Sequence, residues 1–185
     1  MKQKKKQGLS RARMQKMKMS EAPKLVSLGS IFSVHYGVNM ELNALKKDPS
    51  GINFVSRSAR NNGVSAKVAR VADVKPLSAG LMTVAGGGSV LETFVQPEQF
   101  YSGRDLYYLV PPKDMSLQEK LYYCMVIRAN RYRFNYGRQA NRTLKDIQIP
   151  DRSEIPNWVK GIFTKEVGTW QKKLSGLNSP GNLAK

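Results

Sequence analysis

The 185-residue chain has 41% hydrophobic residues, enough for a folded core, and its 31 Lys and Arg against 13 Asp and Glu give a net charge of +18. Such an excess of positive charge opposes compaction, so it favours a phosphate-rich partner, either nucleic acid or an anionic membrane. The single cysteine, Cys124, and the single histidine, His35, exclude a disulfide framework and a Cys/His zinc site.

Residues 1–22 form a basic segment that we expect to be a flexible leader, because eight of the first twenty residues are Lys or Arg and none is acidic. A block of like charge with few apolar residues is typical of a disordered segment that binds a polyanion, and equally of a solubilising tail. No stretch approaches ~18 uninterrupted apolar residues and no apolar signal core follows the lysines. The sequence therefore favours a cytoplasmic protein without membrane contact.

Short β-type runs separated by turn residues follow, and they predict a compact, curved, β-rich body. The expected strands are residues 25–37, 52–58, 66–71, 81–85, 90–96 and 105–110. The turns between them include residues 46–51, the glycine-rich residues 86–89 and residues 97–104. Asn62-Gly63 predicts a tight turn, because both residues tolerate the positive φ that a two-residue hairpin turn requires.

At Ser116 the pattern changes to that of a helix. "SLQE" is a capping box, in which Ser116 caps free N–H groups of the first turn and Glu119 reaches back to it. The apolar residues that recur at helical spacing are Leu117, Leu121, Cys124 and Met125. We expect a helix of about four turns that ends near Arg128 or Arg131, with Cys124 as a small buried hydrophobic residue.

The remainder of the chain predicts a short strand at residues 144–150 and a helix in the segment 156–185. Tyr132, Phe134 and Tyr136, which precede the strand, are interpreted as packing or chain-turning residues. The apolar stripe of the last helix consists of Val159, Phe163, Val167, Trp170 and Leu174. Such a stripe favours packing on the chain's own core over a docking or dimerisation surface for another helix.

The sequence contains no motif for catalysis. The glycine-rich residues 85–90 lack the Lys-Ser/Thr of a phosphate-binding P-loop and the spacing of a dinucleotide fingerprint. His35 lies within an apolar strand pattern, so the serines lack a partner base, and the acidic residues are too scattered to hold Mg²⁺. The chain is therefore expected to bind rather than catalyse, with no catalytic residue, cofactor or metal site.

Two segments combine the side chains that recognise DNA bases. "SRSARNNG", residues 56–63, offers Arg57, Arg60, Asn61 and Asn62. "YGRQANR", residues 136–142, offers Arg138, Gln139, Asn141 and Arg142. Arg can donate two hydrogen bonds to guanine O6 and N7, and Asn or Gln can pair with adenine N6 and N7. These groups can read bases as well as hold phosphate, although loops of this composition also occur without that role.

The order of four segments carries a family resemblance. These are "KLVSLGSIFSVHYGV", "GINFVSRSARNNGVSAKV", "LMTVAGGGSVLETFVQPEQFY" and "YRFNYGRQANRTLKDIQIP". Over about residues 23–159 the chain resembles the target-recognition domain of restriction–modification specificity subunits, of type I and of the related type IIB systems. The resemblance implies an α+β recognition domain, residues 23–155, that contacts double-stranded DNA in the major groove. It also implies an adenine-N6 DNA methyltransferase partner, which flips and methylates the target base, and in type I systems an ATP-driven restriction subunit.

The chain departs from the family in its length. Full specificity subunits carry two recognition domains separated by long helical spacers, whereas this sequence has one domain followed by a short helix. Two copies of the chain would then read a split site, or one copy reads half of it.

Two other functions are compatible with the sequence. A general RNA- or ribosome-associated basic protein would use the lysine-rich leader and the aromatic and arginine residues for backbone contact and stacking. A decoy would share the recognition fold and compete for a host methyltransferase without specifying a site.

Overall fold

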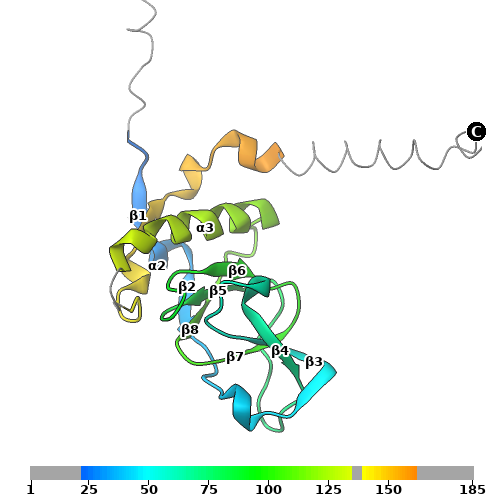
Figure 1. Ribbon diagram of the computed structural model, residues 1–185. Coiled ribbons are helices and arrows are strands. Elements are labelled where there is room, and N and C mark those ends of the chain that lie inside the picture. Colours follow the sequence, from blue (N-terminus) through cyan, green and yellow to red (C-terminus); the bar gives the residue numbers. More distant parts are fainter. Residues whose placement is uncertain (1–21, 135–138, 162–185) are drawn as a thin grey trace, which may run out of the picture.

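The computed structural model describes residues 22–134 and 139–161 of the chain. Within these residues, nine short strands form three small sheets, and the longest helix is α3, Leu117–Ala129. Most strand pairs are antiparallel and the described helices are few, so the fold is α+β, as the sequence predicted. Figure 1 shows α3 lying beside β6 towards one end of the molecule, with β3 and β4 at the opposite end.

The four-stranded sheet has the order β2-β8-β5-β6, and every pair of neighbours is antiparallel. Its strands are β2 (Ser33–Tyr36), β8 (Leu106–Val110), β5 (Met82–Ala85) and β6 (Thr93–Val95). The strands predicted at 81–85 and 105–110 are confirmed as β5 and β8, whereas only residues 93–95 of the strand predicted at 90–96 form β6. The glycine-rich segment forms the turn between β5 and β6, also as predicted.

The three-stranded sheet has the order β4-β3-β7. Its strands are β4 (Val64–Val68), β3 (Lys47–Val55) and β7 (Phe100–Ser102). The prediction of a turn at residues 46–51 is wrong, because β3 already begins at Lys47 and its register against β4 shifts between Lys47 and Ile52. This irregularity accommodates Pro49 and Gly51 within an extended strand, as a β-bulge does.

The prediction of a turn throughout residues 97–104 is also wrong, because this segment contains β7. All three residues of β7 are buried, and the strand pairs in parallel with β3. A strand buried on both faces has no alternation of polar and apolar residues, so its pattern does not distinguish it from a turn.

The predicted strand at residues 25–37 is interrupted. β1 (Leu25–Ser27) is followed by one turn of helix, α2 (Leu28–Ile31), before β2 begins. β1 pairs with β9 (Gln148–Pro150), and the Leu28 N–H donates to the Ile147 carbonyl at 2.8 Å. The strand predicted at 144–150 is therefore present only in its last three residues. The short 3-10 turns are η1 (Leu42–Ala44), η2 (Asn61–Gly63), η3 (Asn130–Phe134), η4 (Leu144–Asp146) and η5 (Arg152–Glu154).

Asn62 and Gly63 have the positive φ that the sequence predicted, 57° and 80°. They end an eight-residue connection, Ser56 to Gly63, rather than forming a two-residue hairpin turn. The Ser56 N–H donates to the Gly63 carbonyl at 2.8 Å and closes this loop between β3 and β4.

The main hydrophobic cluster lies between α3, the four-stranded sheet and β9. Tyr123 of α3 is fully buried, packs edge-on against Phe32 and donates from its hydroxyl to the Pro150 carbonyl at 3.1 Å. The predicted apolar stripe of this helix is partly wrong, because Leu117 and Met125 are each 52% exposed. The helix instead turns the face that contains Tyr123 towards the core, because that face buries more apolar area.

Cys124 is 1% exposed, which confirms its interpretation as a buried hydrophobic residue. Burial raises the pKa of its thiol to about 12. The side chain is therefore a neutral thiol at neutral pH.

The predicted C-terminal helix is described only at its start. Residues 157–161 are helical, and Val159 is buried in the main cluster, which agrees with packing of the stripe on the chain's own core. The rest of the stripe, from Phe163 onwards, lies outside the described residues, as does Tyr136. Tyr132 is 70% exposed and does not pack, whereas Phe134 packs against the main cluster. Of the helices described, none is long and apolar enough to cross a membrane.

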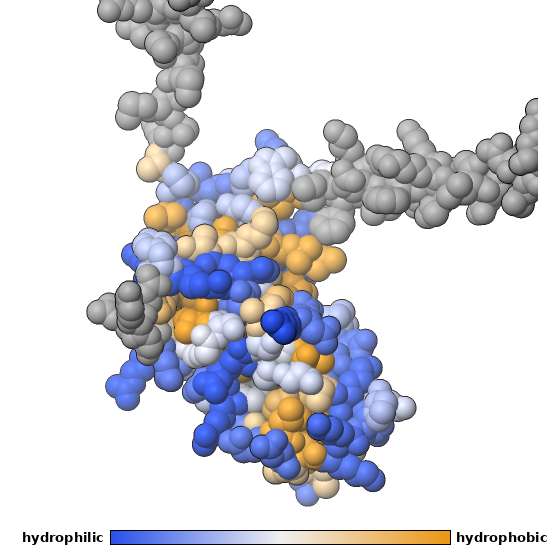
Figure 2. Space-filling model, in the orientation of Figure 1, coloured by the Kyte–Doolittle hydropathy of each residue, from blue (hydrophilic) through white to orange (hydrophobic). Residues whose placement is uncertain are grey.

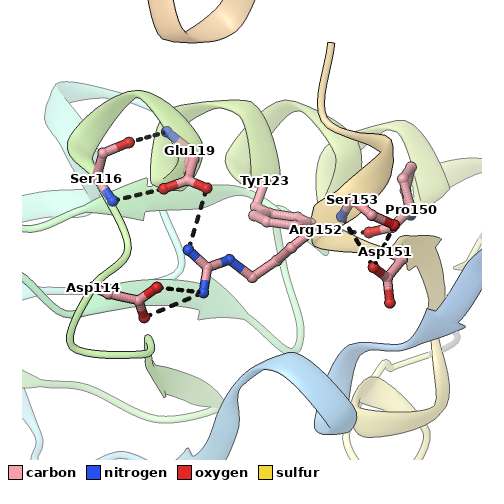
Figure 3. Close-up of polar contacts among 8 residues, drawn as sticks. All are labelled: Asp114, Ser116, Glu119, Tyr123, Pro150, Asp151, Arg152 and Ser153. Carbon is pink, nitrogen blue, oxygen red and sulfur yellow. Dashed lines mark hydrogen bonds and ion pairs between the residues drawn. The ribbon is translucent and has the colours of Figure 1, made fainter. Parts of the chain in front are cut away.

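An ionic network joins the start of α3 to the chain that follows β9 (Figure 3). The predicted capping box is confirmed: the Ser116 N–H donates to Glu119 Oε2 at 2.8 Å, and the Glu119 N–H donates to Ser116 Oγ at 3.2 Å. Arg152 donates to Glu119 Oε1 at 3.3 Å and to Asp114 Oδ2 at 2.9 Å. One guanidinium group therefore fixes the helix start to the segment leading to residues 157–161.

Glu119 is ionised in this network although it is largely buried. Burial opposes ionisation, but hydrogen bonds from Ser116 and Arg152 outweigh it and hold the pKa of Glu119 below its ordinary value of 4.5. The hydrogen bonds of Arg152 likewise lower the pKa of Asp114. Because the unfolded chain binds protons first as pH falls, the stability that these carboxylates contribute is present above pH 4.5 and is lost below it.

We predict that Arg152→Met lowers the free energy of unfolding by about 1–2 kcal/mol at neutral pH, since a charged, half-buried hydrogen-bond donor is removed. The difference between the wild type and the variant should shrink as pH is lowered through 4.5 and below. Urea unfolding over a pH series measures it. A difference that stays constant with pH would contradict the role of the ionised carboxylates.

Candidate nucleic-acid interface

A small hydrophobic cluster brings three strand ends together. Val55 at the end of β3, Ala85 at the end of β5 and Leu106 at the start of β8 are all buried in it. Arg57 follows Val55 by two residues, Gly86 follows Ala85, and Asp105 precedes Leu106. The core therefore places Arg57, the glycine turn Gly86–Gly88 and Asp105 side by side.

Backbone hydrogen bonds hold this glycine turn to three segments that are far apart in the sequence. The Gly86 N–H donates to the Asp105 carbonyl at 2.7 Å, and the Gly86 carbonyl accepts from the Ala140 N–H at 2.9 Å. The Ser89 N–H donates to the Arg57 carbonyl at 3.4 Å. The two segments with base-reading composition thus meet on one turn.

The side chains of these segments gather over Gly87. Arg57 Nη1 donates to Asp105 Oδ2 at 2.7 Å, which forms an ion pair. A methyl group placed on Gly87 would lie 3.2 Å from Arg57 Nη1 and 3.6 Å from both Asp105 Oδ2 and Gln139 Nε2. Glycine therefore lets a guanidinium, a carboxylate and an amide approach the same backbone position.

Asn141 occupies the space above Gly86. Its Nδ2 donates to Gln139 Oε1 at 2.6 Å. A methyl group on Gly86 would lie only 2.6 Å from Asn141 Oδ1 and 2.9 Å from the Tyr107 ring. Within the described residues, Asn141 Oδ1 is buried and accepts no hydrogen bond, so this amide retains an acceptor for a ligand or a water molecule.

Asp105 is fixed on its other side by Tyr36. The Asp105 N–H donates to the Tyr36 hydroxyl at 3.0 Å, and that hydroxyl lies 3.4 Å from Asp105 Oδ1. Tyr36 packs edge-on against Tyr107 with the ring centroids 5.0 Å apart. Burial, and then the neighbouring Tyr36 and Asp105, raise the pKa of Tyr107, which therefore stays neutral at neutral pH.

The other predicted residues of the first segment lie away from this group. Asn62 donates to the Val95 carbonyl at 2.9 Å, so its amide ties the loop to β6. Asn61 donates to the Val64 carbonyl at 3.1 Å within its own turn. Arg60 is exposed at the loop surface. Positive φ at both asparagines, together with these bonds, assigns the pair to the turn itself.

The second segment is described from Gln139 onwards, and the predicted residue Arg138 lies outside the described residues. Arg142 is exposed. Of the eight residues predicted to contact DNA, the structure brings together Arg57, Gln139 and Asn141. We call these three side chains, with Asp105 and the turn Gly86–Gly88, the glycine-turn cluster.

Two further arginines lie beyond the β5–β6 turn. Glu92, which follows this turn, forms ion pairs with Arg128 at 3.8 Å and with Arg131. Arg131 Nε also donates to the Val90 carbonyl at 3.2 Å, and the Arg128 guanidinium lies over the Phe94 ring. One carboxylate therefore holds two cations at the end of α3, and the group keeps a net positive charge.

The sequence did not identify Asp105, Tyr36 or Glu92 as members of these groups. Asp105 stands 48 residues from Arg57, and Tyr36 stands 69 residues from Asp105, so no local spacing connects them. Among residues 22–134 and 139–161, no three His, Cys, Asp or Glu side chains come together to hold a metal ion. On the face shown in Figure 2, hydrophilic side chains cover most of the described surface and hydrophobic ones form separate patches.

Comparison with known proteins identifies relatives of one kind. No family model matches the chain. The type II restriction enzyme specificity subunit S.BcgI of Heyndrickxia coagulans is 25% identical over 134 residues, which are 71% of this chain and 39% of that protein. The HsdS subunit from Thermoanaerobacter tengcongensis matches with a TM-score of 0.58 and 14% identity, over 88% of this chain and 41% of that one.

A second solved structure of a specificity subunit has a similar fold. The type I restriction-modification S subunit from M. genitalium matches with a TM-score of 0.54 and 12% identity, over 90% of this chain and 45% of that one. The chain thus spans less than half the length of each of these relatives. The predicted resemblance to restriction–modification specificity subunits is confirmed, in sequence by S.BcgI and in fold by the two S subunits.

We predict that Gly86→Ala lowers the free energy of unfolding by about 1–3 kcal/mol, because the added methyl group overlaps Asn141 and the Tyr107 ring. Gly161→Ala is the control for adding a methyl group, since there it would meet no atom of the described residues within 4 Å and, in a helix, should leave stability unchanged or raised. Denaturant unfolding of both variants measures the difference. Equal stabilities would show that Asn141 does not pack against the turn.

Proposed function

We propose that this chain, which carries the fold of restriction–modification specificity subunits, binds double-stranded DNA at a specific sequence and is not itself catalytic. The observation that supports this most directly is the glycine-turn cluster. It gathers Arg57, Gln139 and Asn141 from two segments that are 82 residues apart at their nearest members (139 minus 57). Two solvated loops without a shared role would have no reason to place these side chains over the same turn.

The chemistry of the cluster suits base edges in the major groove. Arg57 matches guanine O6 and N7, and the amides of Gln139 and Asn141 match adenine N6 and N7. The glycines add no side chain in front of these groups, so a base edge can approach the backbone closely. Arg60 and Arg142, which are exposed, would contact phosphate and set the register of the protein on the duplex.

The net charge supports a large sequence-independent contribution to binding. With +18 over the chain, many phosphate contacts and release of their counterions are expected. In this proposal residues 1–22 act as an electrostatic leader, residues 23–155 as the target-recognition domain, and residues 156–185 as a C-terminal helix and tail, for which the buried Val159 favours packing on the core over docking or dimerisation. Two copies of this domain would read a split site, or one copy would read half of it.

The proposed partner is an adenine-N6 DNA methyltransferase, with a restriction subunit in addition if the system is of type I. The chain would place the methyltransferase over an adenine in or beside the sequence that it reads. Co-purification from cells, followed by mapping of methylated adenines, tests this role. Methylation that follows the sequence selected by the chain supports it. Capture of a methyltransferase without any change in the methylated sites would identify the chain as a decoy.

We predict that the full-length chain enriches a short recurring sequence from a library of duplex DNA with a randomised central window. Its affinity for that sequence should fall linearly with salt on a logarithmic scale, with a slope set by the number of phosphates contacted. Sequencing of the bound fraction and titrations at several salt concentrations provide both measurements. Failure to enrich any sequence, or tighter binding to single-stranded RNA at the same salt concentration, would contradict the proposal.

A further inference from the structure

We propose that Asp105 is a positioning residue, which orients the Arg57 guanidinium so that it reads a base rather than binding phosphate. This inference rests on the proposed function and adds an acidic residue to the recognition surface. No feature of the sequence around Asp105 marks it for this role.

The geometry of the ion pair leaves part of the guanidinium available. Asp105 Oδ2 engages Arg57 Nη1 at 2.7 Å, and within the described residues Nη2 and Nε of Arg57 form no hydrogen bond. A guanidinium has five donors in a planar fork, so Nη2 and Nε form an edge that can donate to two acceptors at once. Guanine O6 and N7 are such a pair of acceptors. The carboxylate therefore fixes one edge of the group and presents the other.

Asp105 is itself held in place from several directions. Its N–H donates to the Tyr36 hydroxyl at 3.0 Å, and its carbonyl accepts from Gly86 at 2.7 Å. Its φ of 49° lies in the left-handed region, which Asp tolerates better than most residues. The side chain is 25% exposed, against 40% for Arg57. The more rigid and more buried member of the pair is thus the carboxylate, as its orienting role requires.

A carboxylate at this position also has an electrostatic consequence. The chain is strongly basic, and an unpaired arginine on its DNA-binding face would bind any phosphate within reach. Asp105 repels phosphate and neutralises Arg57, so the pair gains little from the DNA backbone. A hydrogen-bond acceptor on a neutral base edge is not repelled in this way. Fixing the side chain before binding also reduces the conformational entropy lost when a base is contacted.

The test compares affinities for the duplex that the wild type selects and for duplexes that differ from it at one base pair. Asp105→Ala should reduce the preference for guanine at one position about tenfold, the scale of one bidentate base contact. Arg57→Ala should reduce the preference at the same position. Asp105→Asn keeps an oxygen that accepts from Arg57 Nη1, so it should lose less of the preference for guanine than Asp105→Ala does. Binding of Asp105→Ala to an unrelated duplex should stay unchanged or become tighter, because a negative charge is removed.

Glu41→Ala is the matched control. Glu41 pairs with Arg104 at 2.8 Å and is exposed, so its removal changes the net charge equally without touching the glycine-turn cluster. It should leave the base preference at every position unchanged. Thermal unfolding confirms that each variant is folded. If Asp105→Ala is unfolded, the base preference is compared between the wild type and Asp105→Asn.

Two results would overturn this inference while leaving the proposed function intact. An unchanged base preference in both Asp105 variants would make the ion pair a structural contact only. Tighter binding of Asp105→Ala to the selected duplex, with the same preference, would make Asp105 a latch that restrains Arg57. If the wild type selects no sequence, the proposed function fails, and this inference fails with it.

Discussion

The absence of side chains at Gly86 and Gly87 is the constraint on which the glycine-turn cluster depends. A methyl group at either position would lie within 3.2 Å of a polar atom of the cluster, namely Asn141 Oδ1 or Arg57 Nη1. Because both positions lack that group, the backbone of Gly86 can pair with Asp105 on one side and Ala140 on the other. Two segments from distant parts of the chain therefore share one support. The strand ends that flank the turn are anchored in the small hydrophobic cluster of Val55, Ala85, Phe100 and Leu106.

The distribution of charge on this surface suits the two tasks of the proposed function. The glycine-turn cluster contains one arginine and one aspartate, so it is neutral at its centre, and its amides are uncharged. Arg60 and Arg142 are exposed, and the +18 of the whole chain adds long-range attraction to phosphate. In the proposed function, a neutral centre within a positively charged chain would separate base recognition from affinity for the DNA backbone.

The sequence predicted the features whose signals are local. The capping box at Ser116 follows from a short pattern and was confirmed, as was the α+β class, which the family resemblance implied. β7 and the buried face of α3 were not predicted correctly, because both depend on partners elsewhere in the fold. The two candidate recognition segments were selected by their composition; the structure brings members of both together, and their contact with DNA stays a prediction. Sequence alone could not separate Asn62, whose amide supports β6, from Gln139, which faces the turn, nor find Asp105 at a distance of 48 residues from Arg57.

The central claim is that both segments read one continuous stretch of DNA from a single surface. The most direct measurement is a comparison of the binding sequences selected by Arg57→Ala and by Gln139→Ala with the wild-type sequence. Because the two side chains meet over Gly87, the base pairs at which the variants lose preference should be the same or adjacent. Losses separated by a full helical turn of DNA, or a loss in only one of the variants, would contradict the account.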